Sequence, residues 1–333
     1  MGKKKGKYIL LWTALLCVVV LWAALSFGGT MTLSLGEMCH ALFSRDFSDA
    51  AGNIFLYSRL PRAMASFLAG AALATAGAVL QTVLGNKLAS PGIIGVNAGA
   101  GLGITICCAC GVFSGWMASV SAFLGSLVVV LAIALFSCRS GVSRTTVILT
   151  GVAMNSVLNA ISESLSVLDT DVAILSTEFR VGGFSAVSYQ RLVPAAVLIV
   201  AALAVLLTLC NELDVVGLGD ETAQGIGLAA GKYRLVFLFA CAVLAGAAVS
   251  FAGLLGFVGL IVPHVARRLV GTESRRLLPM CLLSGGAFVT ACDLAARTLF
   301  APFELPVGIL MAVIGGPAFV VLLIRFKGGH RYA

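Results

Sequence analysis

Residues 68–77 read LAGAALATAG, and a closely similar pattern returns at residues 244–253 as LAGAAVSFAG. Each stretch is followed by an apolar run and a proline, Pro91 in the first case and Pro263 in the second. Lipid supplies no hydrophobic force between helices, so helices in a membrane associate through small residues that let their backbones approach. The two stretches therefore predict two closely packed helices, and their similarity predicts two related halves of the chain.

The composition of the whole chain agrees with a membrane location. Hydrophobic residues make up 60% of the 333 residues and charged residues only 11%, whereas soluble domains carry about 25% charged residues. Backbone polar groups in lipid must be satisfied within their own segment, so long apolar runs indicate transmembrane helices. The composition excludes a soluble globular protein and predicts an all-α integral membrane protein that forms one domain over residues 1–333.

Apolar runs divide the chain into about ten predicted membrane spans. The first run follows four lysines and has about 20 residues, which makes it a full span, longer than the 7–15-residue core of a signal peptide. We therefore expect an uncleaved first helix, and we expect the short eighth span to be a partial or tilted helix. The runs cover residues 8–28, 60–83, 92–110, 116–137, 145–166, 191–210, 233–252, 255–268, 277–298 and 306–324.

The two related stretches lie in the second and seventh spans. These spans are an odd number apart, so the two copies run in opposite directions through the bilayer. This arrangement predicts an inverted repeat of spans 2–5 and 7–10, an architecture typical of transporters with a pathway between the halves. The alternative is a chance match between two Ala- and Gly-rich helices.

The distribution of basic residues predicts the orientation. With the N-terminus inside, 16 of the 22 Lys and Arg residues lie on the inner side and 6 on the outer side, as the positive-inside rule requires. Both termini and residues 211–234 are then cytoplasmic, and the longest outer segments are 29–59 and 167–190. The net charge of +8 thus reflects topology, and it gives no reason to expect nucleic-acid binding.

Residues 211–234, NELDVVGLGDETAQGIGLAAGKYR, are a long polar interruption of the apolar second half. Asp220 follows a glycine and is placed to cap a short helix whose first turn holds Glu221. Ala223, Ile226 and Leu228 predict a small apolar patch that fits a groove on a partner protein. The alternative is an ordinary solvated loop. A phosphate loop is excluded, because Ile226 replaces the first glycine of G-x-x-x-x-G-K-[ST] and a tyrosine replaces its last residue.

Polar residues within the spans are few. Glu163 alone does not indicate an ion-coupled carrier. Asp293 and Arg297 lie at positions i and i+4 on one helix face, so an ion pair between them is the alternative to a functional role. The neutral polar residues either line a pathway for a bulky solute or hold helices together by hydrogen bonds. They are Gln81, Asn86, Asn97, Asn155 and Asn159. No pattern predicts a catalytic residue, a metal site or a cofactor site.

Several stretches together resemble the FecCD-type permeases, the membrane subunits of ATP-binding-cassette importers for iron-siderophores, haem and cobalamin. RLPR at 59–62 resembles the family's R-x-P-R motif, and GFVGLIVPHVARRLVGTESRRLLP at 256–279 is the most specific match. The resemblance covers essentially the whole chain. The other matching stretches are AGAALATAGAVLQ at 69–81, NKLASPGIIGVNAGAG at 86–101, LGDETAQGIGL at 218–228, DLAAR at 293–297, ELPVGI at 304–309 and GGPAF at 315–319.

The resemblance implies a multi-pass permease of a bacterial cytoplasmic membrane, without catalytic activity of its own. It implies a homodimer or a pair with a sibling permease, two partner ATPases on the cytoplasmic side and a substrate-binding protein on the outer side. A ferric siderophore is the favoured solute, with haem and cobalamin as alternatives and an ion-driven carrier as a further one.

The resemblance also implies roles for individual residues. Arg59 and Arg297 are expected to dock the binding protein. The inner gate involves Asn86, Leu88, Thr145 and Thr146, and Lys87 stands where the family usually has proline, which puts the rigidity of that loop in doubt. The expected contact with the ATPases comprises Leu218, Gly219, Asp220, Glu221, Ala223, Gly227 and Leu228.

Overall fold

The structure is a computed structural model that describes residues 3–28, 32–44, 50–112, 115–137 and 144–328. Over these residues the chain forms helices and no strand. The elements are α1 (Lys3–Ser26), α2 (Leu35–Ser44), α3 (Ala50–Ile54), the π-helical η1 (Phe55–Arg59), α4 (Leu60–Val83), α5 (Val96–Ala109), α6 (Gly115–Ser137), α7 (Arg144–Leu168), α8 (Thr170–Val181), α9 (Tyr189–Thr208), α10 (Cys210–Gly217), α11 (Asp220–Gly225), α12 (Ala230–Ala252), α13 (Val258–Val270), α14 (Ser274–Thr298) and α15 (Val307–Gly328).

Seven stretches of helix in the described residues are long and apolar enough to cross a membrane. They lie in α1, in the continuous stretch from α3 to α4, and in α6, α7, α9, α12 and α14. The predicted all-helical membrane architecture is therefore confirmed. Helices α5, α13 and α15 overlap the other three predicted spans. The count of ten stays a prediction, because α5 and α13 have only 14 and 13 residues, and a full span needs about 20.

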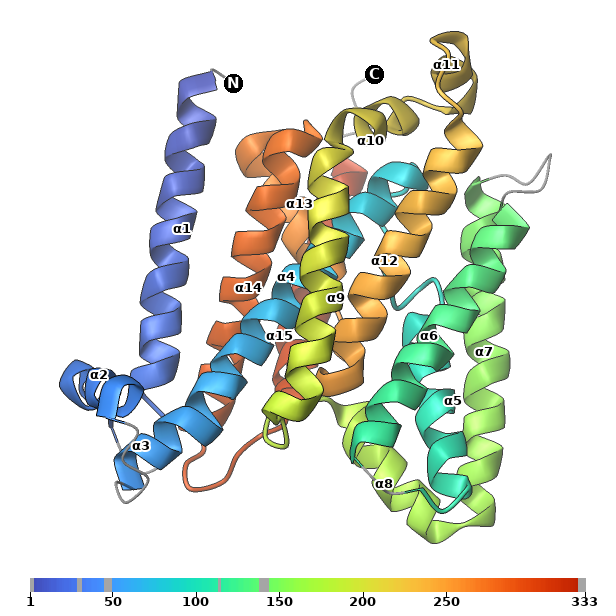
Figure 1. The fold of residues 1–333 in the computed structure, drawn as a ribbon. Helices are drawn as coiled ribbons and strands as arrows, with labels where there is room; N and C mark the ends of the chain where they lie inside the picture. Colours follow the sequence, from blue (N-terminus) through green and yellow to red (C-terminus); the bar gives the residue numbers. More distant parts are fainter. Residues whose placement is uncertain (1–2, 29–31, 45–49, 113–114, 138–143, 329–333) are drawn as a thin grey trace.

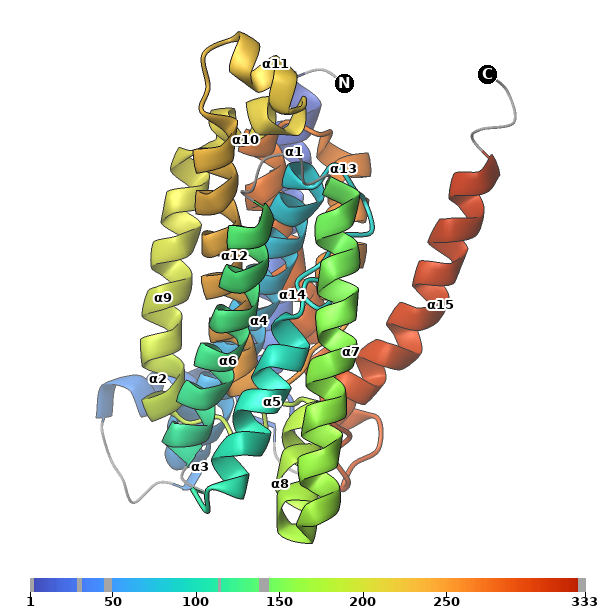
Figure 2. The same cartoon turned by 90° about the vertical axis from the view of Figure 1, so that its right-hand side faces the viewer.

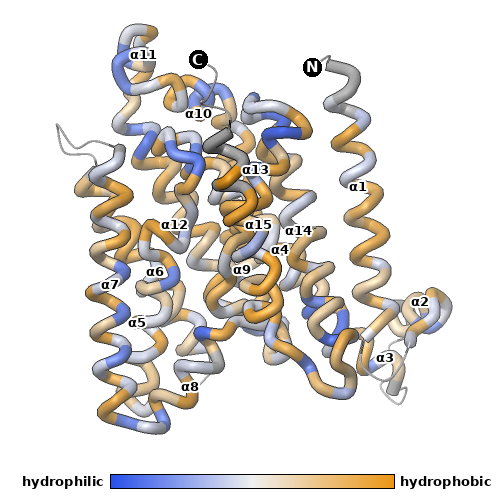
Figure 3. Tube along the Cα trace, turned by 180° about the vertical axis from the view of Figure 1, so that it is seen from behind, coloured by the Kyte–Doolittle hydropathy of each residue, from blue (hydrophilic) through white to orange (hydrophobic). Residues whose placement is uncertain are grey.

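The long helices form a bundle with two distinct ends (Figure 1). One end carries α10 and α11, together with the start of α1 and the end of α15 (Figures 1 and 2). We call it the α11 end. The opposite end, which we call the α8 end, carries α2, α3 and α8. Hydrophilic residues gather towards both ends and hydrophobic residues dominate between them (Figure 3).

Helix α4 lies at the centre of the bundle and packs through its glycines. A Cβ atom on Gly70 would collide with the backbone of Gly285 in α14, and one on Gly77 would collide with the backbone of Gly259 in α13. Only glycine allows this approach. The stretch 68–77 thus owes its composition to contact with two neighbouring helices.

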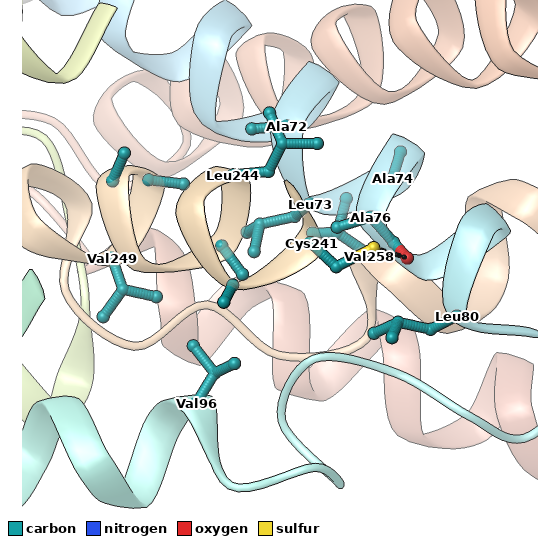
Figure 4. Packing of buried hydrophobic residues seen from close by; sticks show 14 of the residues in the cluster. Ala72, Leu73, Ala74, Ala76, Leu80, Val96, Cys241, Leu244, Val249 and Val258 are labelled. Atoms are coloured by element: carbon teal, nitrogen blue, oxygen red, sulfur yellow. Dashed lines mark hydrogen bonds between the residues drawn. The ribbon is translucent and has the colours of Figure 1, made fainter. Parts of the chain in front are cut away.

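The two related stretches also pack against each other. Leu73 and Ala76 of α4 lie beside Cys241 and Leu244 of α12 (Figure 4), and the Cys241 thiol donates to the Ala76 carbonyl at 3.5 Å. Helix α4 runs from the α8 end to the α11 end, and α12 runs in the opposite direction (Figure 1). The close packing predicted from the small residues is therefore present.

Candidate coupling and docking sites

The polar segment 211–234 contains two short helices, α10 and α11, at the α11 end of the bundle (Figure 1). Gly219 joins them with φ 119°, and Gly227 ends the turn after α11 with φ 83°. Both values lie in the left-handed region that favours glycine. Gly219 and Gly227 therefore set the shape of the segment.

Asp220 does not cap α11 as expected. It is the first residue of the helix, after the N-cap residue Gly219, which makes no side-chain capping bond. Its carboxylate instead forms an ion pair with Arg234 of α12. The pair fixes α11 to the helix that follows it, while Glu221 stays exposed.

The apolar surface of the segment also differs from the expected patch. Ala223 is fully buried, and Leu228 is partly buried against the core. Leu218 and Ile226, in contrast, are 67% and 64% exposed. The pattern of a six-residue helix is too short to show which face turns inward. The exposed apolar pair available to a partner is Leu218 and Ile226, which follow the last residues of α10 and α11.

Helix α10 is fastened to the bundle by Asp214, which sequence reasoning missed. The Asp214 carboxylate accepts hydrogen bonds from the backbone N–H of Ser274 at 3.0 Å and from its hydroxyl at 2.6 Å. Leu213 and Val216 on the same helix are fully buried. The segment is thus a packed part of the structure.

At the α8 end, the two arginines expected to dock a binding protein contact the end of α1. The guanidinium of Arg59 donates to the carbonyls of Leu25, Ser26 and Gly28 at 3.0, 2.6 and 2.7 Å. Arg297 donates to the carbonyl of Ala24. Ala24, Leu25 and Ser26 lie in the last turn of α1, where a helix C-terminus leaves carbonyls without intrahelical partners, and Gly28 follows the helix. Each arginine is only 4% exposed. Both arginines therefore stabilise the end of α1 in this structure.

The same region holds a buried ionic cluster around Asp293. Its carboxylate has no exposed surface and faces Arg62 of α4, whose Nε and Nη2 lie 3.0 Å from Oδ1. The third nitrogen of the Arg62 guanidinium, Nη1, lies 2.8 Å from Glu304. The expected partner of Asp293, Arg297, is farther away, with Nε 3.8 Å from Oδ2. The i, i+4 spacing indicated the correct helix face but missed the main partner, which lies 231 residues earlier.

Two of the expected pathway residues hold helices together. Gln81 is 4% exposed; its Nε2 donates to the carbonyl of Gly259 at 3.0 Å, and its carbonyl accepts from Arg267 of α13. The amide of Asn155 donates to the carbonyls of Gly92 and Ile93 at 3.0 and 3.1 Å. For these two side chains the hydrogen-bonding alternative describes the structure.

The expected gate residues lie towards the α11 end of the bundle (Figure 2). Asn86 accepts a hydrogen bond from the backbone of Leu88 at 2.8 Å, which shapes the turn after α4. Leu88 is 38% exposed, and Thr145 and Thr146 at the start of α7 are also exposed. Asn97 is half-buried in the first turn of α5.

A cavity of about 500 Å³ lies towards the α8 end, inside the single chain. Aromatic and aliphatic side chains of α5, α8 and α12 line it, including Phe179 and Phe251, and Arg62, Arg191 and Glu304 supply its charges. The cavity has the size of a small-molecule pocket. Neither Arg59 nor Arg297 lines it.

Comparison with known proteins agrees with the resemblance seen in the motifs. The FecCD transport family matches residues 15–325. The vitamin B12 import system permease protein BtuC of Salmonella typhi is 33% identical over 321 residues, which cover 94% of this chain and 95% of that protein. BtuC of Klebsiella pneumoniae is 33% identical over 290 residues, 85% of this chain and 86% of that protein.

A solved structure gives the same result at the level of the fold. It is described as a metal-chelate type ABC transporter in an inward-facing conformation, and it matches with a TM-score of 0.85 and 29% identity over 96% of this chain and 99% of the other. The chain belongs to the FecCD transport family, the membrane permeases of ATP-binding-cassette importers.

Proposed function

We propose that this permease imports a bulky metal chelate by alternating access, as a homodimer or beside a sibling permease. Two partner ATPases supply the energy at the α11 end, and a substrate-binding protein delivers the solute at the α8 end. The observation that carries the proposal is the α10–α11 segment, which stands at one end of the bundle and exposes Leu218 and Ile226. The shared location of α11, the start of α1 and the end of α15 supports a cytoplasmic position for all three.

Cobalamin is the first solute to test. The BtuC relatives import vitamin B12 and match this chain over nearly its whole length. The solved metal-chelate transporter keeps a ferric siderophore as the second candidate, and haem follows from the family resemblance. Titration of the cognate binding protein with cyanocobalamin, ferrichrome and haem, followed by tryptophan fluorescence, separates the three. Retention of ferrichrome alone would reject cobalamin.

The contact with the ATPases rests on the exposed pair of the α10–α11 segment. Apolar side chains that are more than 60% exposed at the end of a membrane protein fit a partner's groove. We expect Leu218→Asp and Ile226→Asp to abolish co-purification of the ATPases, and Gln224→Asp, at an exposed position of α11, to preserve it. Full ATPase binding by the double variant Leu218→Asp/Ile226→Asp would reject this contact.

If partner ATPases drive import, the permease alone cannot accumulate solute. Liposomes that contain only this chain should take up no solute, whatever the ion gradient, and Glu163→Gln should leave ATP-driven uptake unchanged. Glu163-dependent uptake without an ATPase would instead establish the ion-driven alternative.

The docking role of Arg59 and Arg297 requires a change of partners. Their guanidinium groups bind carbonyls of α1 in this structure, and carboxylates of a binding protein would form stronger, charge-assisted bonds. Charge reversal of the two arginines should weaken binding-protein affinity, and charge reversal of the partner carboxylates should restore it. If the charge reversals lower the melting temperature without changing the affinity for the binding protein, both residues serve only to stabilise the end of α1.

Helix α7 supports the paired arrangement and the pathway. Only 17% of its most apolar window is buried within the chain. Ser156, Asn159, Glu163 and Ser164 are all exposed on it. Polar and charged side chains at membrane depth are costly against lipid, so this helix fits better against a second permease or an aqueous path. The opposite directions of α4 and α12 favour the inverted repeat that such a pathway requires.

A further inference from the structure

Helix α14 begins without a cap from its own sequence. Its N-cap residue, Glu273, makes no side-chain capping bond, and Arg275 and Arg276 follow in the first turn, where positive charge opposes the helix dipole. Asp214 of α10 supplies the missing cap. Its carboxylate binds both the backbone N–H and the hydroxyl of Ser274, which is fully buried.

Helix α14 is in turn joined to α4 along its length. Gly70 and Gly285 bring the two backbones into direct contact, and the hydroxyl of Ser66 lies 3.2 Å from that of Thr290. Such close-packed interfaces deform little and transmit displacement. The α4–α14 pair therefore connects the α11 end with the ionic cluster at the α8 end.

We propose that Asp214 is a positioning residue, which transmits movement of the α10–α11 segment to the α4–α14 pair. The inference rests on the proposed function, in which partner ATPases move that segment. The ion pair of Asp220 with Arg234 joins α11 to α12, which follows it directly in the chain. Asp214 reaches across 60 residues to a helix that ends at the opposite face of the molecule.

The chemistry of the contact predicts a graded response to substitution. A carboxylate that accepts from a backbone N–H makes a charge-assisted bond, roughly twice as strong as a neutral one. Asparagine keeps one acceptor oxygen for Ser274 but loses the charge, and alanine leaves a buried N–H without a partner. Stimulation of ATP hydrolysis by the loaded binding protein should therefore be strongest with Asp214, weaker in Asp214→Asn and weakest in Asp214→Ala.

The test uses the complete complex of permease, ATPases and binding protein in liposomes. The probes are cyanocobalamin and ferrichrome, added with the binding protein. In Asp214→Ala, we expect the ATPases to co-purify and hydrolyse ATP at the basal rate. Stimulation of hydrolysis by the loaded binding protein should fall at least about fivefold, the lower end of the usual coupling between sites. Asp214→Asn should recover part of the stimulation.

The matched control is Glu212→Gln, an acidic side chain on the same helix whose Oε2 accepts no hydrogen bond from Ser274. It should keep the wild-type ratio of stimulated to basal hydrolysis. Equal loss of basal and stimulated rates in Asp214→Ala, or an unchanged ratio, would overturn the inference. A wild-type chain that binds no ATPase would overturn the proposed function first, and this inference with it.

Discussion

Asp293 depends mainly on Arg62 to balance its charge, because its carboxylate is fully buried and Arg297 lies farther away. Removal of one partner from a buried pair leaves an uncompensated charge and costs about 3–5 kcal/mol. We expect Arg62→Ala to lower the stability of the purified permease by this amount, measured by chemical unfolding in detergent.

Two further variants separate the buried charge from simple loss of packing. Glu304→Gln should cost about 1 kcal/mol or less, because the Glu304 side chain is 44% exposed. The double variant Arg62→Ala/Asp293→Asn should be more stable than Arg62→Ala, since it removes the unpaired charge. A double variant less stable than the single one would contradict this account.

At the residue scale, only part of the ionic cluster around Asp293 could be predicted from the sequence. The four-residue spacing placed Asp293 and Arg297 on one helix face, which the structure shows. The stronger contact with Arg62 joins residues 231 apart, and a single sequence has no local pattern that reports such a pair. Arg62 was visible only as the last residue of the RLPR motif.

At the scale of elements, the α4–α14 contact depends on two glycines. A methyl group on Gly70 would overlap the backbone of α14, and no side-chain movement relieves that overlap. We expect Gly70→Ala to cost about 1–3 kcal/mol, as overpacking usually does, measured by the same unfolding assay. Gly101→Ala is the matched control: Gly101 is also buried in a helix, but a Cβ there has no atom within 4 Å, and alanine favours the helix.

The buried face of α11 gives a second prediction at this scale. Ala223 is fully buried, whereas Glu221 on the same helix is exposed. Ala223→Trp should displace α11 from the bundle and make the α10–α11 segment sensitive to limited proteolysis, while Glu221→Trp should leave the segment resistant. Equal resistance of both variants would show that α11 is not held through Ala223.

Some helices could be predicted from the sequence and others could not. Hydropathy located the long helices, as in the predicted span 191–210 and the observed α9 (Tyr189–Thr208). It missed α2, which is short. A local pattern was nevertheless present, because Ser34 and Glu37 form a reciprocal capping box with N–H···O distances of 2.7 and 3.3 Å.

At the scale of the whole molecule, α7 should face water or a second permease. In a cysteine-free background, we expect Asn159→Cys to react with a membrane-impermeant maleimide or to cross-link two permeases. Val200→Cys on α9 is the control: its side chain is 58% exposed and apolar, so it should face lipid and stay unlabelled. Labelling at position 200 alone would place α7 against lipid and contradict the paired arrangement.

The anchoring of α1 has a consequence for biosynthesis. Arg59 and Arg297 hold the end of α1, yet the ribosome makes Arg297 273 residues after Ala24, whose carbonyl it binds. The α1 carbonyl that Arg297 binds must therefore wait for a late-synthesised partner while the chain is inserted. Chains that stop before α14 should hold the end of α1 through Arg59 alone, so α1 should dissociate more readily from the assembly intermediate and become accessible to quality-control proteases.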